Sequence, residues 1–235
     1  RGTSEIVEIE RTTRSVVWSY DAATSNGNVG KEVEVPSFEP LANGNVLIAE
    51  SGPARVVEID RLGKLVREFP LTVDRPYSGR QTRWMRTTRT GTVLVAHDRD
   101  GAVREYDSAG KVEWEYDVPL SGREPADGHD PGSVGNPCFA ALRLDDGNTL
   151  ITTGNGHSVL RVTPEMEVTW SLTRNELEGI SLARVTTLQV LTNGNYVIGN
   201  SHAGPDQPLL IELDPETTGQ KPGCSRGRNA SIAPP

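Results

Sequence analysis

Hydrophobic and polar residues alternate along this chain in short runs, and turn-forming residues separate one run from the next. The segments Arg55-Val56-Val57-Glu58-Ile59 and Lys111-Val112-Glu113-Trp114-Glu115-Tyr116 are typical. An alternation of period two predicts β-strands, because successive side chains of a strand point to opposite faces of its sheet. The 24 glycines and 16 prolines suit short strands joined by many turns. The pattern therefore predicts an all-β protein.

The same order of elements recurs four times around a hairpin glycine. Each glycine follows Asn, Thr or Asp and precedes an apolar run, and each joins two predicted strands. A third strand follows every hairpin, and a fourth follows in three of the four units. Successive glycines lie about 50 residues apart, the period of a β-propeller blade. The four glycines are Gly44, Gly91, Gly147 and Gly194.

We therefore predict an all-β β-propeller of four-stranded antiparallel blades, with about five blades represented and the terminal blades incomplete. Residues 5–20 indicate a third and a fourth strand without the first two, and no fourth strand is expected after Leu213. The predicted domain covers residues 1–218, and residues 219–235 are predicted to form an irregular tail foreign to it. A weak signal predicts a helical turn over residues 175–178. A β-sandwich is the alternative fold.

Charge and composition exclude several function classes. The formal net charge of -8 gives no basic surface for nucleic acid, so no such partner is expected. No apolar run reaches the roughly 18 residues needed to span a bilayer. Cys138 lies in an apolar run and Cys224 in a polar segment, so a disulfide is not expected.

All four histidines fall at one end of the predicted blades. In a propeller, the loop after a blade's second strand and the connection to the next blade open on the same face, where ligand sites are commonly built. His97, His157 and His202 follow second strands, and His129 lies in a long connection. The positions six residues after the hairpin glycines are all polar: Glu50, His97, Thr153 and Asn200.

These residue types predict acid–base, metal or anion chemistry. Neutral imidazole and carboxylate bind divalent cations, imidazole also transfers protons near neutral pH, and arginine pairs with anions. The expected metal is Ca, Mg, Mn or Zn, bound by Glu50, His97, His157 and His202. The expected catalytic residues are His129, His157, His202 and Arg83. Substrate binding is assigned to Arg80, Arg184, Asn155, Asn200 and Trp84.

Each of these residues also has a structural interpretation. Asp98-Arg99-Asp100-Gly101 is typical of an ordinary turn, and His129 and His157 could serve only to order their loops. The tryptophans Trp18, Trp114 and Trp170 recur at the same fourth-strand position, which predicts packing.

Two phrases, residues 41–50 and 110–116, resemble repeats of the PQQ-binding-like and arylsulfotransferase-like bacterial β-propellers. The resemblance covers about residues 5–214. Residues 154–158 and 200–205 resemble an uncharacterised branch of that family, whose proteins are usually exported. Residues 79–83 depart from its pattern by lacking a histidine and a carboxylate. The resemblance implies a periplasmic or extracellular protein.

The resemblance implies several chemistries: sulfuryl transfer, metal-assisted hydrolysis of lactones or phosphotriesters, and elimination as in streptogramin lyases. PQQ is not expected, because the chain has no vicinal disulfide. The favoured expectation is an exported enzyme that hydrolyses phosphotriesters, lactones, aryl esters or sulfates with help from a metal or histidine. The alternatives are a non-catalytic propeller that binds a protein or saccharide partner, and a sulfuryl transferase or lyase. The substrate is expected to be a small molecule or a saccharide. Copies of the chain are expected to self-associate through the incomplete terminal blades.

Overall fold

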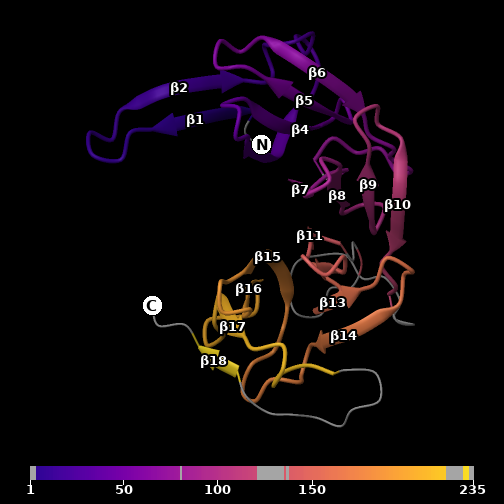
Figure 1. The fold of residues 1–235 in the computed structure, drawn as a ribbon. Coiled ribbons are helices and arrows are strands. Elements are labelled where there is room, and N and C mark those ends of the chain that lie inside the picture. The colour runs from indigo at the N-terminus through magenta and orange to yellow at the C-terminus, as the bar shows by residue number, and fades with distance from the viewer. Residues whose placement is uncertain (1–3, 80, 121–134, 136–137, 221–229, 233–235) are drawn as a thin grey trace. The chain divides into compact units, whose positions relative to one another are not determined.

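The computed structural model describes residues 4–79, 81–120, 135, 138–220 and 230–232. Within these residues the chain forms β-strands and turns and contains no helix (Figure 1). It divides into two compact units, one of residues 1–100 and 105–113 and one of residues 101–104 and 114–235. No helix that is long and apolar enough to cross a membrane occurs in the described part.

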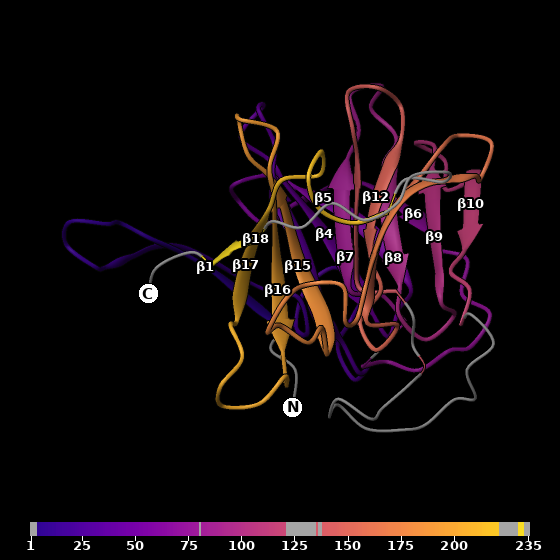
Figure 2. The ribbon, with the colours of Figure 1, turned by 90° about the horizontal axis from the view of Figure 1, so that it is seen from below.

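Four antiparallel sheets of four strands each make up most of the described chain, and strands that follow one another in sequence are neighbours in each sheet. The first sheet contains β3 (Glu34–Pro40), β4 (Val46–Ser51), β5 (Arg55–Ile59) and β6 (Leu65–Pro70). The second contains β7 (Trp84–Thr87), β8 (Val93–His97), β9 (Ala102–Tyr106) and β10 (Val112–Asp117). The third contains β11 (Ala140–Arg143), β12 (Thr149–Thr152), β13 (Ser158–Val162) and β14 (Val168–Thr173). The fourth contains β15 (Arg184–Val190), β16 (Tyr196–Ser201), β17 (Leu210–Leu213) and β18 (Ala230–Ile232). In Figure 2, β15, β16 and β17 lie side by side, as their pairing requires.

These sheets are the blades of a β-propeller, so the predicted fold class is confirmed. The predicted hairpins lie where the glycines place them, with Pro40 paired to Val46 and Val190 paired to Tyr196. Gly44 and Gly194 both adopt a φ of 87°, in the left-handed region that glycine enters without steric cost. The turn chemistry in the sequence therefore determines the strand order within each blade.

The terminal elements differ in part from the sequence prediction. A two-stranded sheet of β1 (Glu5–Ile9) and β2 (Val16–Asp21) stands before the first full blade, as expected. The last blade gains a fourth strand, because β18 pairs with β17, and the expectation of only three strands there is wrong. The Gly- and Arg-rich segment before β18 has no alternating pattern that could have revealed it. The helical turn expected over residues 175–178 is replaced by an isolated bridge between Leu177 and Ile180.

The β1–β2 ribbon carries apolar side chains on both faces. Val7, Ile9, Val16 and Val17 are each about half exposed, between 44% and 58%. Beside the ribbon, a hollow of about 530 Å³ is lined mainly by apolar residues, including Ile6, Trp18, Phe38 and Val46. Self-association through this incomplete blade stays a prediction.

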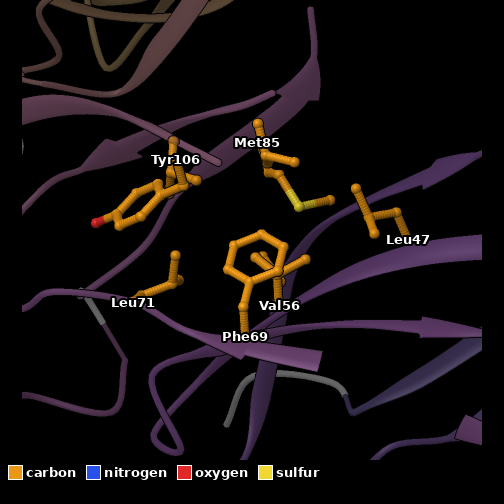
Figure 3. Packing of buried hydrophobic residues seen from close by; sticks show 9 residues of the cluster. Leu47, Val56, Phe69, Leu71, Met85 and Tyr106 are labelled. Carbon is orange, nitrogen blue, oxygen red and sulfur yellow. The ribbon is translucent and has the colours of Figure 1, made fainter. Parts of the chain in front are cut away.

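The core between the first and second sheets is a continuous apolar cluster. Phe69 on β6 packs among Leu47, Val56, Leu71 and Met85, as Figure 3 shows. The ring of Tyr106 lies 6.3 Å from that of Phe69, centroid to centroid. Burial of this kind contributes roughly 25 cal/mol per Å² of apolar surface removed from water.

A second recurring contact joins neighbouring blades at their outer strands. The indole nitrogens of Trp18, Trp114 and Trp170 each donate a hydrogen bond to a backbone carbonyl in the turn that precedes the fourth strand of the following blade. The acceptors are the carbonyls of Arg61 at 2.9 Å, Pro164 at 2.9 Å and Thr218 at 2.7 Å. The packing role predicted for these tryptophans is confirmed, with a specific hydrogen bond added to it.

The hairpin ends carry a third recurring contact. In the first and fourth blades the side chain after the hairpin glycine bonds to the third strand: Asn45 donates to Glu58 and Asn195 donates to Glu212, both at 2.7 Å. In the third blade Asn148 donates instead to Asp146 of its own hairpin, at 2.9 Å. Glu58 also accepts from Asn43 at 3.2 Å and from Arg67 at 2.6 Å. Burial alone would raise the pKa of the Glu58 carboxyl, but these hydrogen bonds outweigh it and lower the pKa below its usual value.

Replacing Glu58 by Gln is expected to reduce the free energy of unfolding by about 1–2 kcal/mol at pH 7, because charge-assisted hydrogen bonds are lost. The depressed pKa means that the carboxylate stabilises the fold fully above its unfolded pKa of about 4.3 and loses this effect as the pH falls through the folded value. Urea denaturation at pH 7 and pH 3 should therefore show a difference that shrinks in acid. The exposed pair of Lys111 and Glu113 provides a control, since Glu113→Gln should cost less than about 0.5 kcal/mol. Equal losses for both variants would contradict this role for Glu58.

Candidate functional site

The polar position that ends each second strand makes its contacts mainly with the connection that leads into the same blade, here called the inlet loop. In the first blade this residue is Glu50, which is fully buried. Its Oε2 atom accepts from Asn28 of the inlet loop at 3.0 Å and from Arg55 at 2.7 Å. Asn28 in turn donates to the backbone carbonyl of Ala22 at 2.8 Å. Glu50 thus fixes the path of the chain into β3.

His97 has the same position in the second blade and is also fully buried. Its Nδ1 lies 2.9 Å from the carbonyl oxygen of Gln81 in the inlet loop, so Nδ1 carries the proton and donates. In the neutral ring, Nε2 then accepts from the hydroxyl of Tyr106 at 2.8 Å. Both nitrogens of His97 are therefore engaged by the protein itself.

Asn200 repeats this arrangement in the fourth blade. Its Oδ1 accepts from the backbone N–H of Ala183 at 2.8 Å, and its Nδ2 donates to the carbonyl of Ser181 at 3.1 Å. Thr153, at the equivalent position of the third blade, instead bonds to Ser158 within its own loop. In three blades, then, this position bonds to an inlet loop: Glu50 bonds to a side chain there, and His97 and Asn200 bond to its backbone.

Several predicted site residues come together around the start of β15. Gly154 and Val185 exchange two backbone hydrogen bonds, at 2.9 and 3.1 Å, which join the loop of the third blade to the first strand of the fourth. His157 Nδ1 donates to the carbonyl of Ala183. Ser201 donates to the carbonyl of Arg184 at 3.2 Å and brings the segment before His202 to the same place. We call this group the β15 cluster: Asn155, His157, Arg184, Asn200 and His202.

The two histidines of the β15 cluster share a backbone conformation but differ in exposure. His157 has a φ of 57° and His202 a φ of 59°, both in the left-handed region. Ala54 and Gly101, which hold the position of His157 in the first two blades, also have positive φ, so the loop geometry itself requires it. His157 is 1% exposed, whereas His202 is exposed to solvent. Of the two, only His202 is accessible to solvent.

Arg184 is half-buried at the head of β15, and its guanidinium carbon lies 5.4 Å from the centre of the Phe139 ring. Asn155 is 4% exposed in the neighbouring loop. Contact with the Phe139 ring holds the Arg184 side chain in place, and the guanidinium keeps the positive charge that attracts an anion.

A different group of predicted residues lies around the start of β7. Arg83 forms an ion pair with the buried carboxylate of Asp98 at 2.8 Å. The guanidinium carbon of Arg86 lies over the Trp84 ring, 4.2 Å from the ring centre. Burial lowers the pKa of Arg86 below its usual value. These residues belong to the first compact unit, whereas the β15 cluster belongs to the second.

The remaining predictions are not decided by these contacts. Arg80 and His129 lie outside the described residues. The shared rim expected for Glu50, His97, His157 and His202 stays a prediction. Within the described residues no three His, Cys, Asp or Glu side chains are grouped so that they could hold a metal ion.

Sequence patterns missed the partners that give these residues their roles. Asn28, Gln81 and Tyr106 were not singled out, although each bonds to a predicted site residue. Only a rule that links the end of a second strand to the inlet loop could have found the first two. Nothing in the sequence pairs Tyr106 with His97.

Comparison with known proteins supports the fold and leaves the family open. No protein-family model matches the chain, and no curated protein matches it. Among solved structures, a protein of unknown function from Bacteroides caccae has a TM-score of 0.63 and 21% identity, covering 92% of this chain and 88% of its own. Virginiamycin B lyase from Staphylococcus aureus has a TM-score of 0.59 and 10% identity over 93% of this chain. This chain spans 62% of the length of that lyase.

A third neighbour is the extracellular domain of a hybrid two component system from Bacteroides thetaiotaomicron. It has a TM-score of 0.55 and 15% identity, and the match covers 90% of this chain and 24% of the other. At these identities the likeness shows the fold alone. The class is therefore a β-propeller with bacterial structural neighbours, and the resemblance to PQQ-binding-like and arylsulfotransferase-like proteins stays a prediction.

Replacing Tyr106 by Phe is expected to destabilise the protein by about 1–3 kcal/mol, because the buried Nε2 of His97 loses the hydroxyl that bonds it. Urea denaturation followed by circular dichroism measures the difference. Tyr77→Phe is the control, because that hydroxyl belongs to a side chain that is 53% exposed. A neutral effect of Tyr106→Phe would show that this hydrogen bond does not hold His97.

Proposed function

We propose that this propeller is an enzyme that cleaves an ester-like bond in a small substrate bound at the β15 cluster. The proposal is supported by contacts from two neighbouring blades at the start of β15: His157 bonds to Ala183, and Ser201, which precedes His202, bonds to Arg184. Similarity of fold does not indicate a particular reaction, so the proposed reaction is argued from the residues of the β15 cluster.

His202 is the proposed acid–base group, since its side chain is exposed and imidazole is the side-chain type best suited to proton transfer near neutral pH. As a base it takes a proton from water while the water oxygen attacks the carbonyl carbon of the ester. The bond to the leaving oxygen then breaks, and the same proton passes from His202 to that oxygen. An acid and an alcohol are the products.

Arg184 is the proposed anion-binding group. Negative charge develops on the carbonyl oxygen during the attack, and a fixed guanidinium stabilises it without having to reorganise. The stacking on Phe139 and the register with Ser201 support this placement of the side chain.

His157 and Asn200 are proposed positioning residues. Both bond to Ala183, one at its carbonyl and the other at its N–H, directly before Arg184. Holding this peptide from both sides limits the motion of the arginine that follows it.

A lyase is the second candidate. In that reaction the same base removes a proton from the carbon next to the one that bears the ester oxygen. The electron pair of that C–H bond forms a carbon–carbon double bond, the C–O bond breaks, and the carboxylate leaves. The structural likeness to virginiamycin B lyase, a catalytically inactive variant of which is known with quinupristin, is the reason for including it. A location outside the cytoplasm is proposed on similar grounds, because one neighbour is an extracellular domain.

The proposal is tested with aryl esters, lactones, phosphotriesters, aryl sulfates and quinupristin, with metal content measured on the same protein. We expect turnover of at least one ester, and a loss of about 10²- to 10³-fold in kcat/KM for His202→Ala with an unchanged melting temperature. Arg184→Ala should lose activity comparably, whereas the exposed Arg11→Ala should not.

Three outcomes would redirect the assignment. No turnover of any substrate would favour a non-catalytic binding propeller. Activity that is lost with a chelator and restored by a divalent ion would favour the metal-assisted reaction. Release of an unsaturated product from quinupristin would favour the lyase.

A further inference from the structure

A second hollow lies in the first compact unit, and none of the residues of the β15 cluster lines it. It measures about 520 Å³, which is within the range of small-molecule sites. Its walls come from the inlet loop of the first blade, the loop after β4 and the inlet loop of the second blade. The lining residues are Lys31, Glu32, Gly52, Pro53, Pro76, Tyr77, Ser78 and Gln81.

The wall that carries Tyr77 is held in place by side-chain bonds to its backbone. Asp100 accepts from the N–H groups of Asp74 at 3.0 Å and Arg75 at 2.9 Å. Gln81 Oε1 accepts from the N–H of Tyr77 at 3.3 Å. Tyr77, which is 53% exposed, is therefore presented by a loop fixed on both sides of it, and the guanidinium carbon of Arg99 lies over its ring, 5.0 Å from the ring centre.

The opposite wall requires a glycine. Gly52 has a φ of 99°, and a Cβ atom there would lie 2.1 Å from the carbonyl oxygen of Glu32. The loop after β4 thus approaches the inlet loop more closely than any other residue type allows. This contact shapes the hollow between them.

Buried polar atoms without a hydrogen-bond partner concentrate beside this hollow. Gln81 is 2% exposed and lines it, and its Nε2 donor has no partner among the described residues. Ser51 Oγ and Thr82 Oγ1 are also buried without a hydrogen-bond partner among the described residues; Ser51 precedes Gly52 and Thr82 follows Gln81 in the sequence, but neither lines the hollow itself. An unmade buried hydrogen bond costs free energy, so a ligand that supplies acceptors and donors would be favoured at this place.

The charges at the rim oppose one another. Lys31 and Glu32 are adjacent, both are exposed, and Ser78 donates to the Glu32 carboxylate at 2.7 Å. A rim with one cation and one anion gives no net attraction for a charged ligand. A hydroxyl can donate to Glu32 and accept from Lys31, whereas an ion is repelled by one of them.

We propose that this hollow binds a neutral saccharide. The apolar face of a sugar ring would stack on the face of Tyr77 opposite Arg99, beside the two prolines, and its hydroxyl oxygens would accept from Gln81 Nε2. The saccharide would be held without any chemical change. The site does not depend on the reaction proposed for the β15 cluster.

The test is direct titration of the full chain by calorimetry, with ligand-observed NMR as a second measurement. The probes are glucose, galactose, mannose, xylose, N-acetylglucosamine and β-linked disaccharides of each, with glucuronic acid and glucose 6-phosphate as charged counterparts. We expect at least one neutral sugar to bind more tightly than its charged counterparts.

Three variants locate the site. Tyr77→Ala should weaken binding about tenfold, since it removes the stacking surface. Gln81→Glu keeps the acceptor for the Tyr77 N–H but removes the donor, and should weaken binding about fivefold. Phe38→Ala is the control, because Phe38 is an aromatic residue of the same unit that is 44% exposed and lines no part of this hollow. His202→Ala should bind the sugar as the unaltered chain does, which separates this test from that of the proposed reaction.

Two results would overturn the proposal. One is that no neutral sugar binds at tens of millimolar or that only the charged probes bind. The other is that Tyr77→Ala binds a sugar as well as the unaltered chain does. Tyr77 is exposed, so this variant should fold and the test does not depend on Gln81→Glu.

Discussion

The blades of this protein depend on the satisfaction of backbone groups where the chain passes from one sheet to the next. An inlet loop belongs to no sheet, so its N–H and C=O groups lack the regular partners that strands provide. Glu50 reaches this loop through Asn28, His97 reaches it directly at Gln81, and Asn200 bonds it at Ser181 and Ala183. The same position in three blades therefore uses a carboxylate, an imidazole and an amide for one structural task. Glu50 and His97, whose residue types suggested catalysis or metal binding, hold the inlet loops in place.

Contacts between consecutive blades follow the same logic at the outer strands. Three tryptophans each donate to a carbonyl in a turn of the following blade, where no strand neighbour is available. The hydrogen bond fixes the register of one blade against the next, while the indole ring covers apolar surface. At the hairpin ends, buried carboxylates such as Glu58 bind the turn amides to the third strand. Repetition of a blade thus repeats a small set of polar contacts along with the apolar alternation.

Once the chain path is fixed, the loops at the ends of the second strands are free to vary. His157 and His202 stand in loops whose backbone enters the left-handed region, and the first two blades place Ala54 and Gly101 at the position of His157. The positive φ is a property of the loop, since alanine and glycine adopt it at this position as well. In His157 the side chain also donates a hydrogen bond to the carbonyl of Ala183. The hollow beside Tyr77 is also formed by loops that polar side chains hold in place. Asp100 and Gln81 bond to the backbone of the loop that carries Tyr77, and Gly52 lets the loop after β4 approach the inlet loop of the first blade.

The sequence alone determined the class of fold, because the alternation of a strand and the glycine of a turn each depend on only a few consecutive residues and can be recognised in the sequence. Gly44 and Gly194 mark hairpins that the structure confirms, and the recurring tryptophans mark the fourth strands. The strand β18 escaped prediction, since the segment before it carries no alternation and its pairing with β17 is decided by the sheet it joins. For the site, the sequence placed His157 and His202 after second strands, where the structure has them, but it could not say what a histidine nitrogen bonds to. Partners such as Tyr106 and Ala183 lie on other strands or blades, and only the packing of those elements brings them to an imidazole.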